Sequence, residues 1–215
     1  MLTVYGRRNS SSVQLVMWAI NELNVDVERL DYGHGFAATN TPDYLSMNPM
    51  GRVPVLRDGN TTMFESAAIL RYLGARYGDE TFWPNNPDIR GPLDAIAEWG
   101  KNTFAEGVLR IFVYEVRMSP ETRDPAFLEA AVENLTPLAE ILEGLLHDRE
   151  WVGSDHFTFA DIACGHILHR YFSLDWERPI LPNLDRYYQK LQCRSAYREN
   201  AMVSFDDLRG SYRPL

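Results

Sequence analysis

The chain has 215 residues, of which 24% are charged and 45% hydrophobic, and its formal net charge is −9. These fractions are ordinary for a globular protein with one good core or two small ones. The negative charge argues against nucleic acid and against anionic membrane surfaces as partners, although a local positive pocket can still bind a small anion.

The first third of the chain alternates strand and helix patterns. Strands are predicted over residues 2–5 and 25–30, with a helix between them that begins at Ser11. Ser11 and Gln14 have the spacing of a capping box, and apolar residues then recur on one face of the helix. Two smaller elements are expected next, a flexible loop over residues 33–37 and a short helix over residues 42–47.

A β-hairpin is predicted after the short helix. Its extended runs are residues 54–57 and 61–64, and Asp58-Gly59-Asn60 between them is a strong turn signal. Val53-Pro54 enters the first strand as an extended dipeptide, because proline disfavours the α region for the residue before it. The hairpin therefore leaves an exposed backbone edge at Val53.

An apolar helix is predicted directly after the hairpin. It begins at Glu65-Ser66 and runs to residue 77, where Gly78 is expected to form a left-handed cap. The helix N-terminus therefore carries one carboxylate and one hydroxyl. Together with the backbone edge at Val53, this arrangement suits a small, extended, zwitterionic peptide.

Strand signals disappear in the rest of the chain. Residues 79–88 contain two prolines and several Asp and Asn residues, which indicates a linker. Thr158 and Asp161 form the Asp variant of the capping box, and capping explains both residues without catalysis. Helical patterns cover residues 89–116, 127–146, 158–171, 183–192 and 196–201.

The joint spacing of Val53-Pro54 and Glu65-Ser66 resembles that of the glutathione transferases, and the resemblance covers essentially the whole chain. It implies the glutathione transferase fold: an α/β thioredoxin-like N-terminal domain over residues 1–78, a linker over 79–88 and an all-α helical C-terminal domain over 89–215. It also implies a cis peptide bond before Pro54 and a homodimer.

The resemblance further implies glutathione as the co-substrate. Glu65 would pair with the γ-glutamyl ammonium, while Ser66 and the helix N-terminus would bind the carboxylate beside it. The backbone of Val53, with Pro54 in the cis form, would pair with the cysteinyl segment as an extra strand. Arg52 would bind the glycyl carboxylate.

The glutathione thiol would then point to the turn before the first helix. Lowering its pKa from about 8.5 by about two units requires roughly 2.7 kcal/mol of preferential thiolate stabilisation. In the family resemblance, the position that is usually a catalytic serine or cysteine falls on Asn9, which can donate a hydrogen bond but cannot be a nucleophile. The expected thiol partners are therefore Asn9, Ser10 and Ser11, with helix capping as the competing role for Ser11.

The second substrate would lie between the domains, near the middle of the long helix. Arg110 or Tyr114 would supply polarity there. The competing interpretation is that an aromatic stripe at helical spacing belongs to the core. The candidate walls of this pocket are Trp99, Phe104, Val108 and Phe112.

Conjugation of the glutathione thiolate to a small electrophile is the expected function. A glutathione-dependent disulfide or peroxide reductase is the enzymatic alternative, and a non-catalytic glutathione-binding or regulatory module is the alternative from another class. Assays with an aryl halide and a small disulfide separate the two enzymes, and retention on immobilised glutathione tests for the binding site.

Metal and membrane partners are not expected. His166 and His169 lie three apart on a helix, but no acidic or cysteine ligand stands at a helpful spacing. No secretory signal opens the chain, and no apolar stretch approaches membrane-spanning length. Cys164 and Cys193 form no CxxC motif, so a reducing, cytoplasmic compartment is expected.

Overall fold

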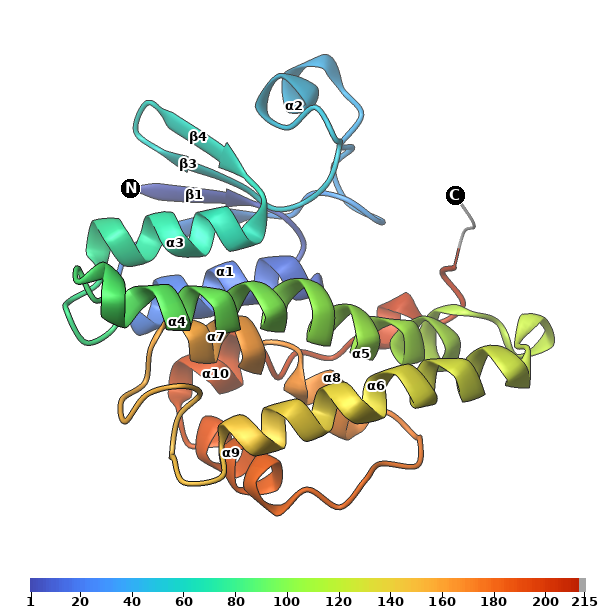
Figure 1. Cartoon of the computed structure of the whole chain (residues 1–215). Helices are drawn as coiled ribbons and strands as arrows, with labels where there is room; N and C mark the ends of the chain where they lie inside the picture. The colour runs from blue at the N-terminus through green and yellow to red at the C-terminus, as the bar shows by residue number, and fades with distance from the viewer. Residues whose placement is uncertain (213–215) are drawn as a thin grey trace.

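Four strands form one mixed sheet in the order β2-β1-β3-β4 (Figure 1). The computed structural model describes residues 1–212. Strand β1 pairs in parallel with β2 and antiparallel with β3, so that Val4 faces Arg29 on one side and Leu56 on the other. The strands are β1 (Leu2–Tyr5), β2 (Val27–Leu30), β3 (Val55–Asp58) and β4 (Thr61–Phe64).

Helices α1 (Ser11–Glu22) and α3 (Ser66–Tyr77) lie side by side between the sheet and the helical half of the chain (Figure 1). Their apolar faces are buried, as the spacing of the apolar residues predicts. Helix α2 (Pro42–Met47) stands apart from them. The predicted hairpin and short helix are confirmed, whereas strand β2 is two residues shorter than expected.

The second half of the chain is helical. Its first helical run continues from Pro87 to Arg117, close to the predicted residues 89–116, but contains two π-helical segments. Asn86 caps the run by accepting a hydrogen bond from the Asp88 N–H, so the helix begins inside the predicted linker. The run comprises α4 (Pro87–Trp99), η1 (Gly100–Phe104), α5 (Ala105–Phe112) and η2 (Val113–Arg117).

The remaining helices pack beneath this long run (Figure 1). They are α6 (Pro125–Leu145), α7 (Phe159–Gly165), α8 (Leu168–Ser173), α9 (Pro182–Gln192) and α10 (Ser195–Asn200), with short 3-10 turns at Pro120–Thr122 and Asp206–Leu208. Within residues 1–212, no helix combines the length and the apolar character needed to cross a bilayer.

The helix expected over residues 158–171 is interrupted. The capping box of Thr158 and Asp161 is present, but α7 ends at Gly165 and α8 starts only at Leu168. The Nδ1 atom of the His166 side chain lies 2.9 Å from the Ala163 carbonyl oxygen, which the next helical N–H would otherwise use. Burial lowers the pKa of His166 to about 3, so the ring is neutral and donates this hydrogen bond from Nδ1–H.

Gly78 does not adopt the predicted left-handed conformation. Its φ and ψ angles of −78° and 151° are extended. A Cβ atom at this position would lie 2.5 Å from the Gly74 carbonyl oxygen and 2.9 Å from Phe82. The close approach of these groups, rather than a positive φ angle, therefore requires glycine here.

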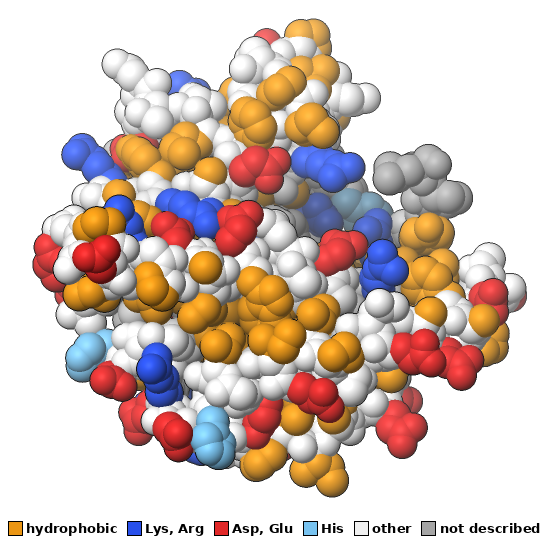
Figure 2. All heavy atoms as spheres, viewed as in Figure 1, with side chains coloured by type: hydrophobic (Ala, Val, Ile, Leu, Met, Phe, Trp, Pro, Cys, Tyr) orange, Lys and Arg blue, Asp and Glu red, His pale blue; other side chains and the backbone are white. Residues whose placement is uncertain are grey.

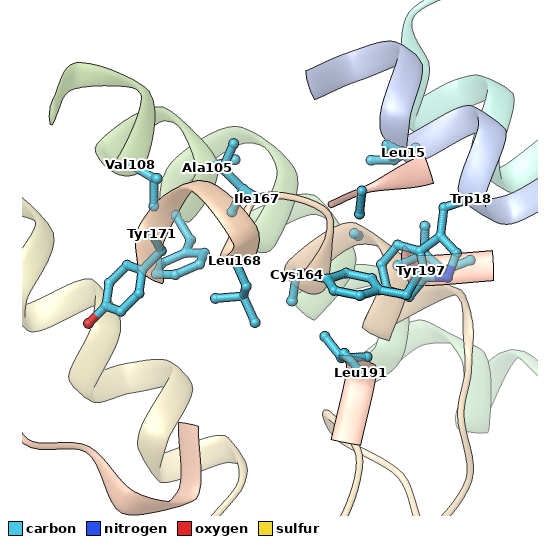
Figure 3. Close-up of a cluster of buried hydrophobic side chains, with 14 of the residues drawn as sticks. Leu15, Trp18, Ala105, Val108, Cys164, Ile167, Leu168, Tyr171, Leu191 and Tyr197 are labelled. Atoms are coloured by element: carbon cyan, nitrogen blue, oxygen red, sulfur yellow. The ribbon is translucent and has the colours of Figure 1, made fainter. Parts of the chain in front are cut away.

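The two halves of the chain share one core (Figure 3). The rings of Trp18 in α1 and Tyr197 in α10 meet edge to face with centroids 4.7 Å apart. Arg194 adds an ion pair across the same junction, 2.6 Å from Glu22 of α1. Figure 3 also shows Leu15, Cys164 and Leu191 in this cluster. The junction fixes α1, and with it the turn before α1, relative to the helical domain.

We expect Gly100→Ala to destabilise the protein by about 1–3 kcal/mol, the usual cost of overpacking a core. A Cβ atom at Gly100 would lie 2.4 Å from the Cys164 Sγ atom. Urea unfolding measures the change, and the double variant with Cys164→Ala should recover part of it. Equal midpoints for wild type and Gly100→Ala would contradict this packing.

Candidate active site

The backbone edge before strand β3 is free to accept a ligand. The Val53-Pro54 peptide bond is cis, as predicted. In the described part of the chain, no hydrogen bond uses the N–H or C=O group of Val53. The Tyr44 hydroxyl and the Asn48 amide both donate to the Arg52 carbonyl, at 2.8 and 2.7 Å, and hold this edge from behind. No pattern in the sequence indicated that Tyr44 and Asn48 support this edge.

Glu65 and Ser66 open helix α3 beside this edge. Glu65 has φ 68° and ψ 107°, a conformation that costs a non-glycine residue energy and is concentrated at ligand-binding sites. Its side chain neither caps the helix nor forms an ion pair with any residue from 1 to 212. Ser66 is 4% exposed and begins the helix, where backbone N–H groups are free. The pair therefore presents a carboxylate and a hydroxyl to a ligand.

The helical domain contributes Lys101 to the electrostatics of Glu65. Lys101 lies in the π-helical segment η1 and is partly buried. Burial lowers the pKa of its ammonium group, while the negative charges of Glu65, Glu106 and Glu98 oppose that shift. This contribution from the second domain was missed because nothing in the sequence pairs Lys101 with Glu65.

The turn before α1 holds Asn9, Ser10 and Ser11. The predicted capping box at Ser11 is wrong, because Ser10 occupies the cap position and its carbonyl accepts the Gln14 N–H at 2.8 Å. The Ser10 side chain forms no capping hydrogen bond. Both serine hydroxyls are therefore left for a ligand rather than used by the helix.

Arg170 of helix α8 holds the turn before α1 in place. Its guanidinium donates to the Asn9 carbonyl at 2.8 Å and lies 4.2 Å from the centre of the Phe112 ring. Asn9 and Ser10 are 7% and 8% exposed, so each shows only a small polar surface. The Oδ1 atom of Asn9 is buried without a partner among residues 1–212.

A cavity of about 480 Å³ lies between this turn and the long helix. Asn9, Ser10 and Ser11 line it on one side, and Arg52 reaches it from the backbone edge. The structure therefore brings together the predicted thiol-binding turn and the residue predicted to bind the glycyl carboxylate. The opposite wall includes Leu109, Phe112, Val113 and Phe127.

Comparisons with known proteins agree with this geometry. The sequence profile "Glutathione S-transferase, N-terminal domain" matches residues 1–75, and "Glutathione S-transferase, C-terminal domain" matches residues 125–190. Glutathione S-transferase GstB of Escherichia coli K12 is 34% identical over 94% of this chain and 99% of its own. The chain belongs to the glutathione S-transferase family.

Further members of the family span the chain as well. Glutathione S-transferase 4 of Zea mays is 27% identical over 90% of this chain and 88% of its own. The crystal structure of the theta class glutathione S-transferase from Xanthomonas axonopodis pv. citri with glutathione bound superposes with a TM-score of 0.89. It is 33% identical and covers 94% of this chain and 98% of that one. The predicted glutathione transferase fold is therefore confirmed.

In this glutathione S-transferase family member, the predicted walls of the second-substrate pocket are only partly at the cavity. Phe112 lines it, but Phe104 and Val108 have no exposed surface and belong to the core. Trp99 stacks on Phe104 with centroids 5.8 Å apart and does not line the cavity. Helical spacing identifies an apolar face, but it does not distinguish a face on the core from a face on a cleft.

Only one of the two polar candidates on the long helix lines the cavity. Arg110 lines the cavity, whereas Tyr114 is 8% exposed and stacks on Phe127 with centroids 6.2 Å apart. Residues that the sequence reasoning missed are Leu109, Val113 and Phe127 on the apolar wall, and Arg7, Arg117 and Arg170 among the charged groups.

The two histidines contact different groups, and only His166 is buried. His166 bonds to the Ala163 carbonyl, and the His169 ring lies 3.2 Å from the Tyr188 hydroxyl. Across residues 1–212, no group of three His, Cys, Asp or Glu side chains is arranged to hold a metal ion.

Proposed function

We propose that the protein joins the thiol sulfur of glutathione to a small electrophile. The observation that carries this proposal is the unpaired backbone of Val53 beside the free carboxylate of Glu65 and the hydroxyl of Ser66. A tripeptide with an amino-acid head satisfies all three groups at once. Membership of the glutathione S-transferase family supports the same ligand.

In the proposed complex, the two ends of glutathione bind to opposite charges. The γ-glutamyl ammonium pairs with Glu65, and its carboxylate takes Ser66 and the first N–H groups of α3. The cysteinyl segment bonds to the backbone of Val53, and the glycyl carboxylate binds Arg52, which has no other hydrogen-bond partner for its side chain among residues 1–212. The cysteine side chain then faces the turn before α1.

The thiol is activated at that turn. The Asn9 amide and the Ser10 hydroxyl donate to the sulfur, and the N-terminus of α1 adds a positive field. Solvent takes the thiol proton, and the thiolate then attacks an electrophilic carbon. A carbon–sulfur bond forms while the bond to the leaving group breaks, and the leaving group departs with that electron pair.

Conjugation is favoured over disulfide reduction through a protein thiol. Both cysteines are free, but Cys164 is buried in the helical core and neither lines the cavity. Burial also raises the pKa of the Cys164 thiol, which keeps it protonated. The homodimer and the cytoplasmic compartment stay predictions, and the free cysteines support a reducing environment.

The proposed thiol partners are tested by titrating bound glutathione. We expect Asn9→Ala and Ser10→Ala each to raise the pKa of the bound thiol by at least one unit, about 1.4 kcal/mol of lost thiolate stabilisation. Thiolate absorbance in the ultraviolet measures the pKa, and conjugation of an aryl halide measures turnover. Ser12→Ala is the matched control, because Ser12 lies in the same helix turn but does not line the cavity. Unchanged pKa values in both single variants and in the double variant would refute the assignment.

A further inference from the structure

Besides Arg52, four arginines line the cavity, in a chain whose formal net charge is −9. Arg7 comes from the turn before α1, Arg170 from α8, and Arg110 and Arg117 from the long helix. Figure 2 shows Lys and Arg side chains gathered around the hollow between the sheet domain at the top and the long helix below it. The local charge at the cavity is therefore opposite to that of the whole protein.

These arginines are not neutralised by the protein. Among residues 1–212, none of the four forms an ion pair, and Glu106 is the one carboxylate that also lines the cavity. Arg117 bonds to the Ser211 hydroxyl at 3.2 Å. The Arg110 side chain has no hydrogen-bond partner in the described part of the chain. The positive charge thus stays available to a ligand.

Arg170 is buried and Arg7 is half-buried, and the hydrogen-bonding groups of both guanidinium groups are incompletely used. Arg170 is 4% exposed, and the Nε atoms of Arg7 and Arg170 lie buried without partners in the described chain. Burial, and then the charges of Arg7 and Arg117, lower the pKa of Arg170 to about 9. Burial and the charge of Arg117 lower that of Arg7 in the same way. Holding like charges together is unfavourable, and an anion in the cavity relieves the repulsion.

The arginines lie on different walls of the cavity, one near the proposed glutathione site and two on the long helix opposite it. A Cβ atom at Gly33 would lie 3.4 Å from Val53 Cγ1 and 3.5 Å from Arg7 Nη1, so Arg7 adjoins the backbone edge proposed for glutathione. Arg110 and Arg117 stand on the long helix, on the other wall of the cavity. Val113 lies between these two arginines along the helix, and Leu109 lies directly before Arg110.

We propose that the second substrate is a small aromatic or aliphatic carboxylate whose oxyanion is bound by Arg110 and Arg117. This inference rests on the proposed function, because it names the substrate class of the same site. Arginine matches a carboxylate with two parallel hydrogen bonds, which fixes the orientation of the electrophilic carbon. Leu109, Val113 and Phe127, which line the cavity and keep exposed surface, offer contacts for the apolar body of the substrate.

A chloronitrobenzoate illustrates the step. The glutathione thiolate attacks the ring carbon that bears chlorine, the carbon–sulfur bond forms, and chloride leaves with the electron pair of the broken bond. The carboxylate of the substrate stays bound to arginine and takes no part in bond making. The thiol proton has already passed to solvent.

The anion subsite is tested first by binding, without turnover. The probes are 4-methyl-3-nitrobenzoate and its neutral carboxamide, which lack a leaving group, titrated calorimetrically into the protein saturated with S-methylglutathione. We expect the carboxylate to bind at least tenfold more tightly than the carboxamide. Equal affinities would overturn the proposal, even in a protein that conjugates neutral electrophiles.

Single variants locate the anion. Arg110→Gln and Arg117→Gln should each lower the preference for the carboxylate at least fivefold, with the affinity for S-methylglutathione changed less than threefold. Arg149→Gln is the matched control, because this exposed arginine lies outside the cavity and its loss changes the net charge equally. A carboxylate preference that survives in both cavity variants, or that falls as much in Arg149→Gln, overturns the assignment.

Turnover separates this proposal from the function on which it rests. The rates with glutathione are compared for 4-chloro-3-nitrobenzoate and its carboxamide, each divided by its uncatalysed rate. We expect kcat/KM for the carboxylate to exceed that for the carboxamide at least tenfold. If the carboxylate probe binds through the arginines but no electrophile is conjugated, the proposed function fails and the anion subsite stands. If the protein conjugates the carboxylate and the carboxamide equally well, the anion subsite is refuted and the proposed function stands.

Discussion

Glu65→Gln should lower the affinity for glutathione by about one to two orders of magnitude. The substitution keeps the size of the side chain but replaces the proposed ionic partner of the γ-glutamyl ammonium by a neutral one. Hydrogen bonds to charged groups contribute about 1.5–3 kcal/mol, which sets the expected range. Isothermal titration calorimetry with glutathione measures the change, and Ser66→Ala should show a smaller loss because it removes a neutral donor.

Two controls sharpen this experiment. Glu28→Gln removes an equal charge from an exposed position on strand β2 and should leave the affinity unchanged. Glu65→Gly should also lose affinity, yet its free energy of unfolding should not fall, because glycine adopts a φ angle of 68° without a steric penalty. Full glutathione affinity in Glu65→Gln would show that the tripeptide head binds elsewhere.

Asp161→Ala should lower the free energy of unfolding by about 3 kcal/mol, with a fall in Tm of about 10 °C for a chain of this length. One carboxylate oxygen accepts the Val152 N–H at 2.8 Å and the Tyr187 hydroxyl at 3.0 Å. The other accepts the Thr158 N–H at 2.8 Å. Alanine leaves the buried N–H groups of Val152 and Thr158 without a partner, while the Tyr187 hydroxyl keeps only the Asp161 backbone carbonyl, at 3.3 Å. Thermal unfolding followed by circular dichroism measures the cost.

Asp161→Asn is the matched comparison. Its amide oxygen can still accept the hydrogen bonds made to one of the two carboxylate oxygens. We therefore expect about half of the loss of stability seen in Asp161→Ala. Burial raises the pKa of Asp161 to about 7, against the effect of its hydrogen-bond donors, so asparagine also avoids burying a charge. An Asp161→Ala variant as stable as wild type would mean that these hydrogen bonds contribute nothing to folding.

Local signals were sufficient for most of the fold. The Asp58-Gly59 turn, the Thr158 and Asp161 capping box, and the periodicity of α1 each depend on residues close together in the chain, and the structure contains all three. The sequence predictions failed where a side-chain contact, or a contact with a distant residue, determines the local backbone structure. His166 ends α7 through its own imidazole, and Gly78 is required by the approach of Phe82 rather than by its φ angle.

The sequence indicated the candidate site in the first domain, but it indicated much less of the cavity wall in the second. Val53, Glu65 and Ser66 occur within fourteen residues, so their order alone suggested one ligand. The cavity, in contrast, joins Arg7 to Arg170, and no periodic pattern relates positions so far apart. Phe104 and Phe112 lie eight residues apart, but only Phe112 lines the cavity.

The meeting of Trp18 with Tyr197 has a consequence for recombination between relatives. A chimaera that takes its sheet domain from one parent and its helical domain from another must keep the residues that pack around the Trp18 ring. These include Gly165, where an added Cβ atom would lie 3.0 Å from Trp18. Parents that differ at this contact would yield hybrids with a displaced α1, and the turn before α1 would shift with it. Exchange of whole segments is therefore constrained far from either substrate.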